Sequence, residues 1–152
     1  MRFSILTVSD SSSADANNDK SGPLLIELIN GSATMSKVSR PSIITYSIVP
    51  DDFSRIQDAL RQLACECDVL ITTGGKSSHS SVTEIRFSGT GFSPRDVTPE
   101  ATKSILQKEC NGISTALLIR GLRATPYAAL TRLTAGQHFH LPISANLSLQ
   151  ES

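Results

Sequence analysis

The chain has 152 residues, and its 14 lysine or arginine residues balance its 14 aspartate or glutamate residues, so the formal net charge is zero. This length suits a single domain that can bury a sizeable core. Balanced charge gives no bias toward nucleic acid or an anionic membrane surface, and we expect neither as a partner. No run approaches the ~20 apolar residues that a membrane span needs, so we expect a cytoplasmic protein.

The three cysteines are Cys65, Cys67 and Cys110. They contain no C-x-x-C pair, and a single residue between Cys65 and Cys67 is too short a spacing for a usual zinc site. An odd number of cysteines argues against a disulfide scaffold, so we expect reduced thiols. The histidine pair His138 and His140 is a weak metal signal because no further ligands accompany it.

The first third of the chain predicts a strand, a loop, a helix and a second strand. Residues 3–8 form a short apolar run without charge, which is typical of a buried strand. The polar stretch 9–20 predicts a loop. Pro23 then suits the first turn of a helix, and the apolar residues after it recur at helical spacing up to Ile29. The second strand is expected over 43–49.

A second helix is expected after the turn at 50–52, because Ile56, Leu60 and Leu63 share one helical face. The third strand is expected over 68–73. Strands that alternate with helices predict right-handed β-α-β units around a mostly parallel sheet.

The later part of the chain predicts further helices. Thr98 and Pro99 are typical of an N-cap and the first helical position. The segment 110–112 is expected to end this helix, and another apolar helix is expected to begin at Ile113.

Polar residues follow each of the three predicted strands. Ligands of parallel α/β folds bind beyond the carboxyl ends of the strands. The expected positions are Ser9-Asp10, Pro50-Asp51-Asp52 and Thr73-Gly74-Gly75. The glycines let the backbone approach a phosphate closely, although a purely structural turn uses glycine in the same way.

The segment 90–102 carries a more specific signal, because it joins a glycine turn, an Arg-Asp pair and a helix start. Asp96 lies just before the helix N-terminus, where an anion is stabilised. Its carboxylate either forms a structural salt bridge with Arg95 or holds Mg²⁺ and orients a nucleophile. Asp51 and Asp52 either begin a helix or supply a second carboxylate for a metal–phosphate site.

Five segments together resemble successive signatures of the molybdopterin adenylyltransferase family, which includes the gephyrin-type G domain, and they occur in that family's order. The resemblance covers roughly residues 3–75 and 90–136. The segments are Leu6-Thr7-Val8-Ser9-Asp10-Ser11, Asp19-Lys20-Ser21-Gly22-Pro23, Ile48-Val49-Pro50-Asp51-Asp52, Ile71-Thr72-Thr73-Gly74-Gly75 and 90–102.

The resemblance implies an α/β fold, a three-layer α/β/α sandwich of the MoaB/Mog type with a mostly parallel sheet, usually assembled as a homotrimer. It implies a nucleotidyltransferase that uses MgATP to adenylylate the terminal phosphate of molybdopterin and releases pyrophosphate. The product then passes to a separate molybdenum-insertion domain, which this chain does not contain.

The resemblance also assigns site residues in this chain. Asp51 and Asp96 match the family's essential acids, and we take them as catalytic residues and as ligands of Mg²⁺. The expected substrate- and nucleotide-binding residues are Asp10, Asp19, Ser21, Gly74, Gly75, Thr90 and Gly91.

The chain departs from the family pattern in two places. Residues 76–89 interrupt the glycine loop between Gly75 and Thr90, so the expected domain, 1–136, contains a serine-rich insertion. Insertion into a loop costs little stability, but a displacement of about 1 Å in a binding loop can cost ~100-fold in rate. The resemblance stops after about Gly136. We expect 137–152 to be an atypical, disordered tail that lacks the family's last strand, binding loop and helix.

These departures leave an alternative to the active enzyme, namely an inactive, splice-variant-like chain or a scaffold module that retains the fold. The borders of the insertion, Gly75-Lys76-Ser77 and Phe87-Ser88-Gly89, can be encoded by splice-donor and splice-acceptor consensus sequences. Removal of the segment between them restores G-G-T-G in frame. We hypothesise that residues 76–89 come from a retained intron.

We therefore expect complementary DNA from the source to include transcripts in which Gly75 is followed directly by Thr90. Amplification and sequencing across this junction is the measurement. If every transcript contained the codons for 76–89, the retained-intron hypothesis would be wrong.

Overall fold

The computed structural model describes residues 1–32, 41–74 and 95–138, and the backbone of 141–146. The predicted insertion, 76–89, lies outside the described residues. The elements in chain order are β1 (Arg2–Val8), α1 (Asp10–Ala14), η1 (Ala16–Asn18), α2 (Ser21–Gly31), β2 (Ser42–Val49), α4 (Phe53–Ala64), β3 (Val69–Gly74), α5 (Thr98–Ile105), β4 (Lys108–Glu109), α6 (Asn111–Ala124), η2 (Pro126–Leu130), β5 (Ala135–His138) and β6 (Leu141–Asn146).

The elements surround one sheet in the order β2-β1-β3-β6-β5-β4. β1 is parallel to both β2 and β3, and β3 is parallel to β6. β5 runs antiparallel to β6, and the short β4 runs antiparallel to β5. The prediction of a mostly parallel sheet is confirmed.

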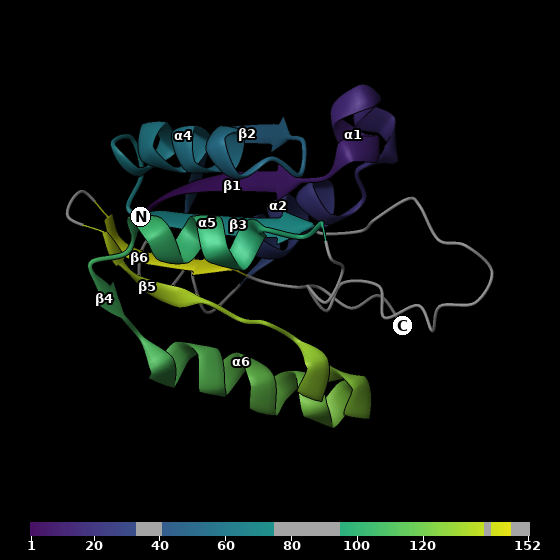
Figure 1. The fold of residues 1–152 in the computed structure, drawn as a ribbon, viewed down its shortest axis with the longest axis vertical. Coiled ribbons are helices and arrows are strands. Elements are labelled where there is room, and N and C mark those ends of the chain that lie inside the picture. Colours follow the sequence, from purple (N-terminus) through teal and green to yellow (C-terminus); the bar gives the residue numbers. More distant parts are fainter. Residues whose placement is uncertain (33–40, 75–94, 139–140, 147–152) are drawn as a thin grey trace.

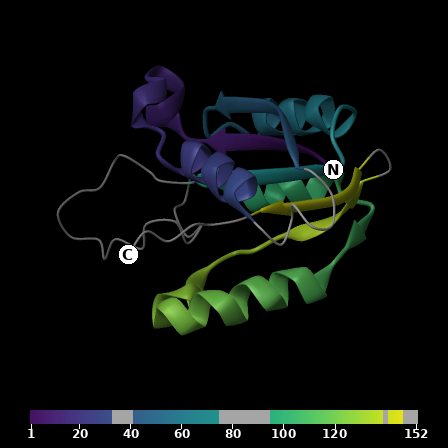
Figure 2. The ribbon, with the colours of Figure 1, turned by 180° about the vertical axis from the view of Figure 1, so that it is seen from behind.

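Helices cover both faces of this sheet, as the α/β/α prediction requires. Side chains alternate between the faces of a strand, so β1 contributes to two cores. Leu6 and Val8 pack with α4, α5 and β3 on one face, whereas Phe3 and Ile5 pack with α2 on the other. Figure 1 shows α4 and α5 in front of the sheet, and Figure 2 shows α2 over the opposite face.

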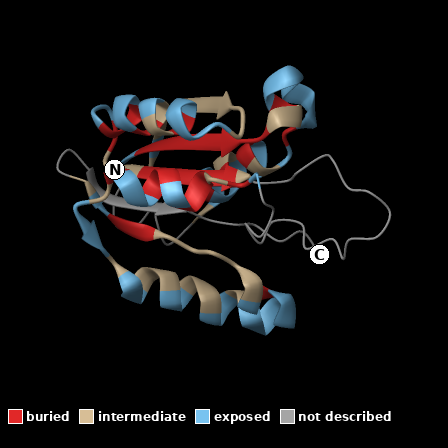
Figure 3. Cartoon of the chain, in the orientation of Figure 1, coloured by how far each residue is buried: buried red, intermediate tan, exposed pale blue. Residues whose placement is uncertain are grey.

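Helix α6 differs from the other long helices. It lies beyond β4 and β5 in both views (Figures 1 and 2) and contains no buried residue. Its apolar side chains Ile119 and Leu122 are 49% and 44% exposed, and Figure 3 shows no buried position along the helix. No helix of the described ranges is both long and apolar enough to cross a membrane.

Two sequence predictions about local structure are wrong. The expected loop at 9–20 contains α1 and η1, because Ser9 Oγ accepts a hydrogen bond from Ser12 N at 3.3 Å and Asp15 Oδ1 accepts one from Asn17 N at 3.0 Å. Side-chain caps of this kind satisfy the free N–H groups of short helices. The expected helix at 98–112 ends at Ile105, since the residues after it pair with β5 instead.

The expected disorder of 137–152 is also wrong over residues 141–146. These residues form β6, in the interior of the sheet between β3 and β5. Without them, β3 would present a row of unpaired backbone N–H and C=O groups. β6 therefore satisfies the hydrogen-bonding groups of β3 on that side. Residues 147–152 lie outside the described part of the chain.

We expect Leu60→Ala to lower the free energy of unfolding by about 2–5 kcal/mol, because it removes a fully buried side chain from the core under α4. Denaturant unfolding measures this change. Leu28→Ala is the control: Leu28 lies on α2 with 55% of its surface exposed, so the change should stay below about 1 kcal/mol. Equal losses in the two variants would contradict this description of the core.

Candidate functional site

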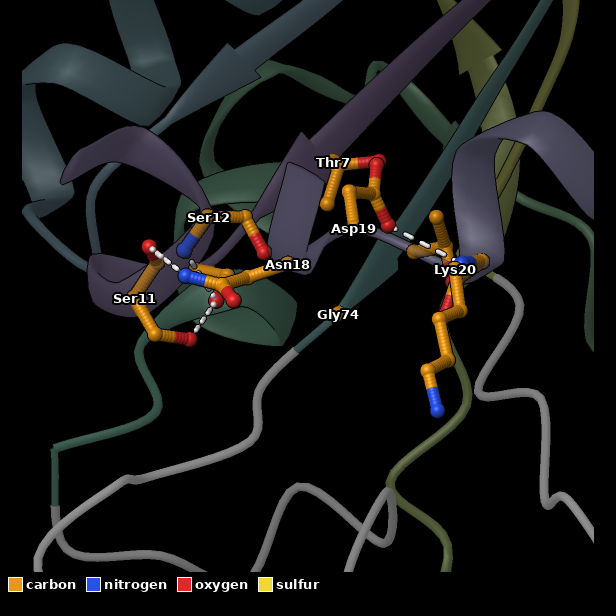
Figure 4. A pocket seen from close by; sticks show the side chains of 10 residues that line it. Thr7, Ser11, Ser12, Asn18, Asp19, Lys20 and Gly74 are labelled. Carbon is orange, nitrogen blue, oxygen red and sulfur yellow. Dashed lines mark hydrogen bonds between the residues drawn. The ribbon is translucent and has the colours of Figure 1, made fainter. Parts of the chain in front are cut away.

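A polar pocket opens beyond the carboxyl ends of β1 and β3, beside the start of α2 (Figure 4). Hydroxyl groups dominate its lining. The lining residues are Thr7, Ser9, Ser11, Ser12, Asn18, Asp19, Lys20, Ser21, Thr73 and Gly74. The Thr7 hydroxyl is buried and interacts with the hydroxyl of Tyr46, which also donates to Asp19 Oδ2.

The N-terminus of α2 forms one side of this pocket. Asp19 Oδ1 accepts hydrogen bonds from the backbone N–H groups of Ser21, at 2.9 Å, and Gly22, at 3.2 Å. Lys20 stands at the N-cap position without a side-chain cap bond, and Figure 4 shows its side chain extending away from the helix. An ammonium group beside a helix N-terminus is a suitable environment for an anion.

Gly74 closes the pocket at the end of β3. Its φ is +117°, and a Cβ at this position would lie only 2.0 Å from the Val8 carbonyl oxygen. No side chain fits there, so glycine is required by both conformation and space. The other predicted loop residues, Gly75, Thr90 and Gly91, lie outside the described residues.

A group of carboxylates lies at the same sheet edge, around the ends of β1 and β2. The Asp51 backbone N–H donates to Asp10 Oδ1 at 3.1 Å. Asp10 Oδ2 forms an ion pair with Arg95 at 3.1 Å. Arg95 therefore pairs with Asp10, not with Asp96 as the structural alternative from the sequence supposed.

Asp51 is the most perturbed acid of this group. Burial, followed by the negative charges of Asp96 and Asp10, raises its pKa from 3.8 to about 6. Its Oδ1 atom is buried and has no hydrogen-bond partner among the described residues. The structure thus brings Asp51 and Asp96 close enough for their charges to interact, as predicted from their places after β2 and before α5.

Asp96 is held in place through its side chain and its backbone. It is 7% exposed, and its Oδ1 accepts from the Thr98 N–H at 3.0 Å. The prediction of Thr98 as the N-cap is therefore wrong. Val97 is the N-cap, Thr98 is the first helical residue, and Asp96 accepts from the Thr98 N–H from one position before the cap. Arg132 Nη2 donates to the Asp96 carbonyl oxygen at 2.7 Å, and its Nη1 pairs with Glu100 of α5.

The predicted site residues that are described thus fall into two neighbouring groups. Asp19, Ser21 and Gly74 line the pocket, whereas Asp10 joins Asp51 and Asp96 in the carboxylate group. Sequence reasoning missed Thr7, Lys20 and Arg132. Thr7 and Lys20 stand inside the segments that carried the resemblance, and hydroxyls at strand ends could have signalled a phosphate pocket. Arg132 gave no local signal, since its partners are 32 and 36 positions away.

Residues 4–81 match the family described as the probable molybdopterin binding domain. This chain belongs to that family. It is 38% identical to the molybdenum cofactor synthesis protein cinnamon of Drosophila melanogaster over 136 residues, which cover 88% of this chain and 19% of cinnamon. It is 34% identical to a molybdopterin adenylyltransferase of Pyrococcus furiosus, with 89% of this chain and 68% of that protein covered.

The fold agrees with this membership. The molybdopterin biosynthesis enzyme MoaB of Thermus thermophilus superposes with a TM-score of 0.72 at 32% identity, covering 96% of this chain and 79% of that one. The family match ends at residue 81, within the predicted insertion. The chain spans only about a fifth of the length of cinnamon.

We expect Asp51→Asn to raise the free energy of unfolding by about 1–2 kcal/mol above pH 6, a value discounted for partial solvent exposure. The folded-state pKa of about 6 lies above the ordinary value of 3.8. The charged carboxylate therefore destabilises the fold at high pH, and this penalty disappears as pH falls toward 3.8.

Thermal or denaturant unfolding between pH 4 and pH 8 measures the effect. Asp52→Asn is the matched control: Asp52 caps α4 through a 2.9 Å bond from Arg55 N, and asparagine caps a helix equally well. A gain that does not vary with pH in Asp51→Asn would contradict the electrostatic description.

Proposed function

We propose that this chain adenylylates molybdopterin with MgATP in molybdenum cofactor biosynthesis. The family membership and the relatives named molybdopterin adenylyltransferase support this activity. The observation that carries the proposal is the partly buried Asp51 carboxylate, which interacts with two other acids and whose buried Oδ1 has no hydrogen-bond partner among the described residues. A charged carboxylate in this environment destabilises the fold by itself, and a bound cation would offset that cost.

The acids fit a magnesium ion that shares its coordination with a nucleotide. Among the described residues, no group of three or more His, Cys, Asp or Glu side chains is arranged to hold a metal by itself. Mg²⁺ in nucleotide sites uses one or two carboxylates together with phosphate oxygens. Asp51 and Asp96 would supply those carboxylates, and the ion would neutralise charge on the phosphates.

The pocket would hold the phosphate-bearing substrate beside these acids. A phosphate there would meet the start of α2, the Lys20 ammonium and the hydroxyls of Thr7 and Ser21. In the reaction, an oxygen of the terminal phosphate of molybdopterin bonds to the α-phosphorus of ATP. The bond from that phosphorus to the bridging oxygen breaks, and pyrophosphate leaves. In such a reaction, the protein contributes by positioning the two phosphate groups and neutralising their charge.

Arg95 and Arg132 would keep the acids in place during this reaction. Arg95 offsets the charge of Asp10, whose other oxygen holds the Asp51 backbone. Arg132 fixes the Asp96 backbone relative to α5.

We also propose a homotrimer, a separate molybdenum-insertion partner and a cytoplasmic location. The exposed apolar side chains of α6 support assembly, because a 14-residue helix without a buried residue has an apolar face to cover. The much greater length of cinnamon is consistent with further domains that act on the product.

The proposal is tested by incubating the full chain with molybdopterin and MgATP and measuring adenylylated molybdopterin by chromatography. A variant without residues 76–89 is assayed beside it. We expect product from at least one of the two proteins, and a loss of at least about 100-fold when Asp51→Asn is added. Asp58→Asn, an exposed acid on α4, is the control for the loss of one negative charge.

Product from both proteins would show that the insertion is tolerated. Product from the shortened protein alone would identify the insertion as an inactivating interruption. If neither protein formed product while both unfolded cooperatively and kept a defined oligomeric state, the proposal would be wrong for this chain, and a scaffold module would be the better description.

A further inference from the structure

Asp19 lines the pocket, yet both of its carboxylate oxygens bind the protein itself. Asp19 is only 7% exposed. Its Oδ1 accepts from the N–H groups of Ser21 and Gly22, and its Oδ2 accepts from the Tyr46 hydroxyl. The bonds join the turn before α2 to β2, across 27 positions of sequence. A carboxylate engaged in this way is suited to holding a turn, not to binding an anionic substrate.

Tyr46 is built into the fold as a hydrogen-bond donor. Its ring packs against the core between β1 and α2. Burial first, and then the hydrogen bond to Asp19, raise its pKa from 10.0 to about 12, so the hydroxyl keeps its proton. Gly22 permits the contact: a Cβ there would lie 2.4 Å from Tyr46 Cε2 and 2.7 Å from Asp19 Oδ2.

Lys20 and Ser21 follow Asp19 at the start of α2 and also line the pocket. Lys20 has helical backbone angles, φ −103° and ψ −27°, and does not cap α2 with its side chain. A cation at a helix N-terminus is repelled by the helix dipole. The neighbouring Asp19 charge and its bonds to the first N–H groups offset this repulsion and fix the turn. Within the described residues, Lys20 forms no ion pair.

We propose that Asp19 and Tyr46 are positioning residues that aim Lys20 and Ser21 at a phosphate group in the pocket, so that Lys20 and not Asp19 binds the substrate's phosphate. The inference rests on the proposed function, because that function brings two phosphate-bearing ligands, molybdopterin and ATP, to this edge of the sheet. It assigns Asp19 an indirect role.

The test is a double-mutant cycle on the full chain with Tyr46→Phe and Lys20→Met. Binding of molybdopterin and of ATP is titrated separately, which requires no turnover. We expect each single variant to weaken the same ligand by about fivefold to tenfold. The double variant should bind no worse than Lys20→Met alone, since Tyr46 acts through Lys20. The ligand whose binding is weakened is the one whose phosphate lies beside Lys20 and Ser21.

Kinetics give a second readout where turnover is present. Tyr46→Phe should raise the KM of that ligand and leave kcat within about twofold, as expected for loss of uniform binding. Tyr127→Phe, in which the chain's other tyrosine loses its hydroxyl, is the matched control and should change neither constant. Thermal unfolding of every variant establishes that it is folded.

Several outcomes would overturn the inference. Unchanged affinity in Lys20→Met would remove Lys20 as the phosphate ligand, and this result does not depend on the folding of Tyr46→Phe. Independent, additive losses in the double variant would assign Tyr46 a role that does not pass through Lys20. Binding of neither ligand by the unaltered chain would also refute it. Binding without product would refute the proposed function alone.

Discussion

The site depends on the pairing of β1 with parallel strands on both sides. Because β2, β1 and β3 run in the same direction and in register up to Val49, Val8 and Gly74, their carboxyl ends meet at one edge. The absence of a side chain at Gly74 lets the chain turn directly against Val8. The side chains assigned to the pocket or to the carboxylate group lie at the carboxyl ends of these strands, in the segments that follow them or at the start of a neighbouring helix. The chemistry therefore rests on backbone pairing.

Electrostatic compensation organises that edge. Three acids converge there, and Arg95, which forms an ion pair with Asp10, offsets part of their mutual repulsion. Arg132 holds the Asp96 backbone and pairs with Glu100. The repulsion that remains, together with burial, raises the pKa of Asp51. Functional sites commonly retain such unfavourable groups, since the arrangement that suits a ligand is seldom the arrangement that suits the empty fold.

The sequence predicts much of this because hydrophobic periodicity reports burial directly. Ile56, Leu60 and Leu63 share a face and are buried as expected. Asp51, after β2, and Asp96, before α5, lie close enough for their charges to interact, as expected of acids at one edge of the sheet. The failures have a common cause in long-range or side-chain hydrogen bonds. The caps of α1 by Ser9, the β5 pairing that ends α5, and the Tyr46–Asp19 contact involve partners that local patterns do not reveal. The expectation of a disordered tail is wrong at β6 because the partners of this strand, β3 and β5, lie outside the local pattern that the expectation uses.

The position of β6 has a consequence for how the chain is made. This strand lies inside the sheet, next to β3, yet it is formed by residues 141–146, about seventy positions after its neighbour. During synthesis, β1, β2 and β3 can pair early. The other edge of β3 stays unpaired until β6, the last of the described elements, has left the ribosome. Until then a nascent chain presents an unsatisfied strand edge, the kind of surface that recruits chaperones or other chains. The interior of the sheet is thus completed by β6, the last of the described elements along the chain.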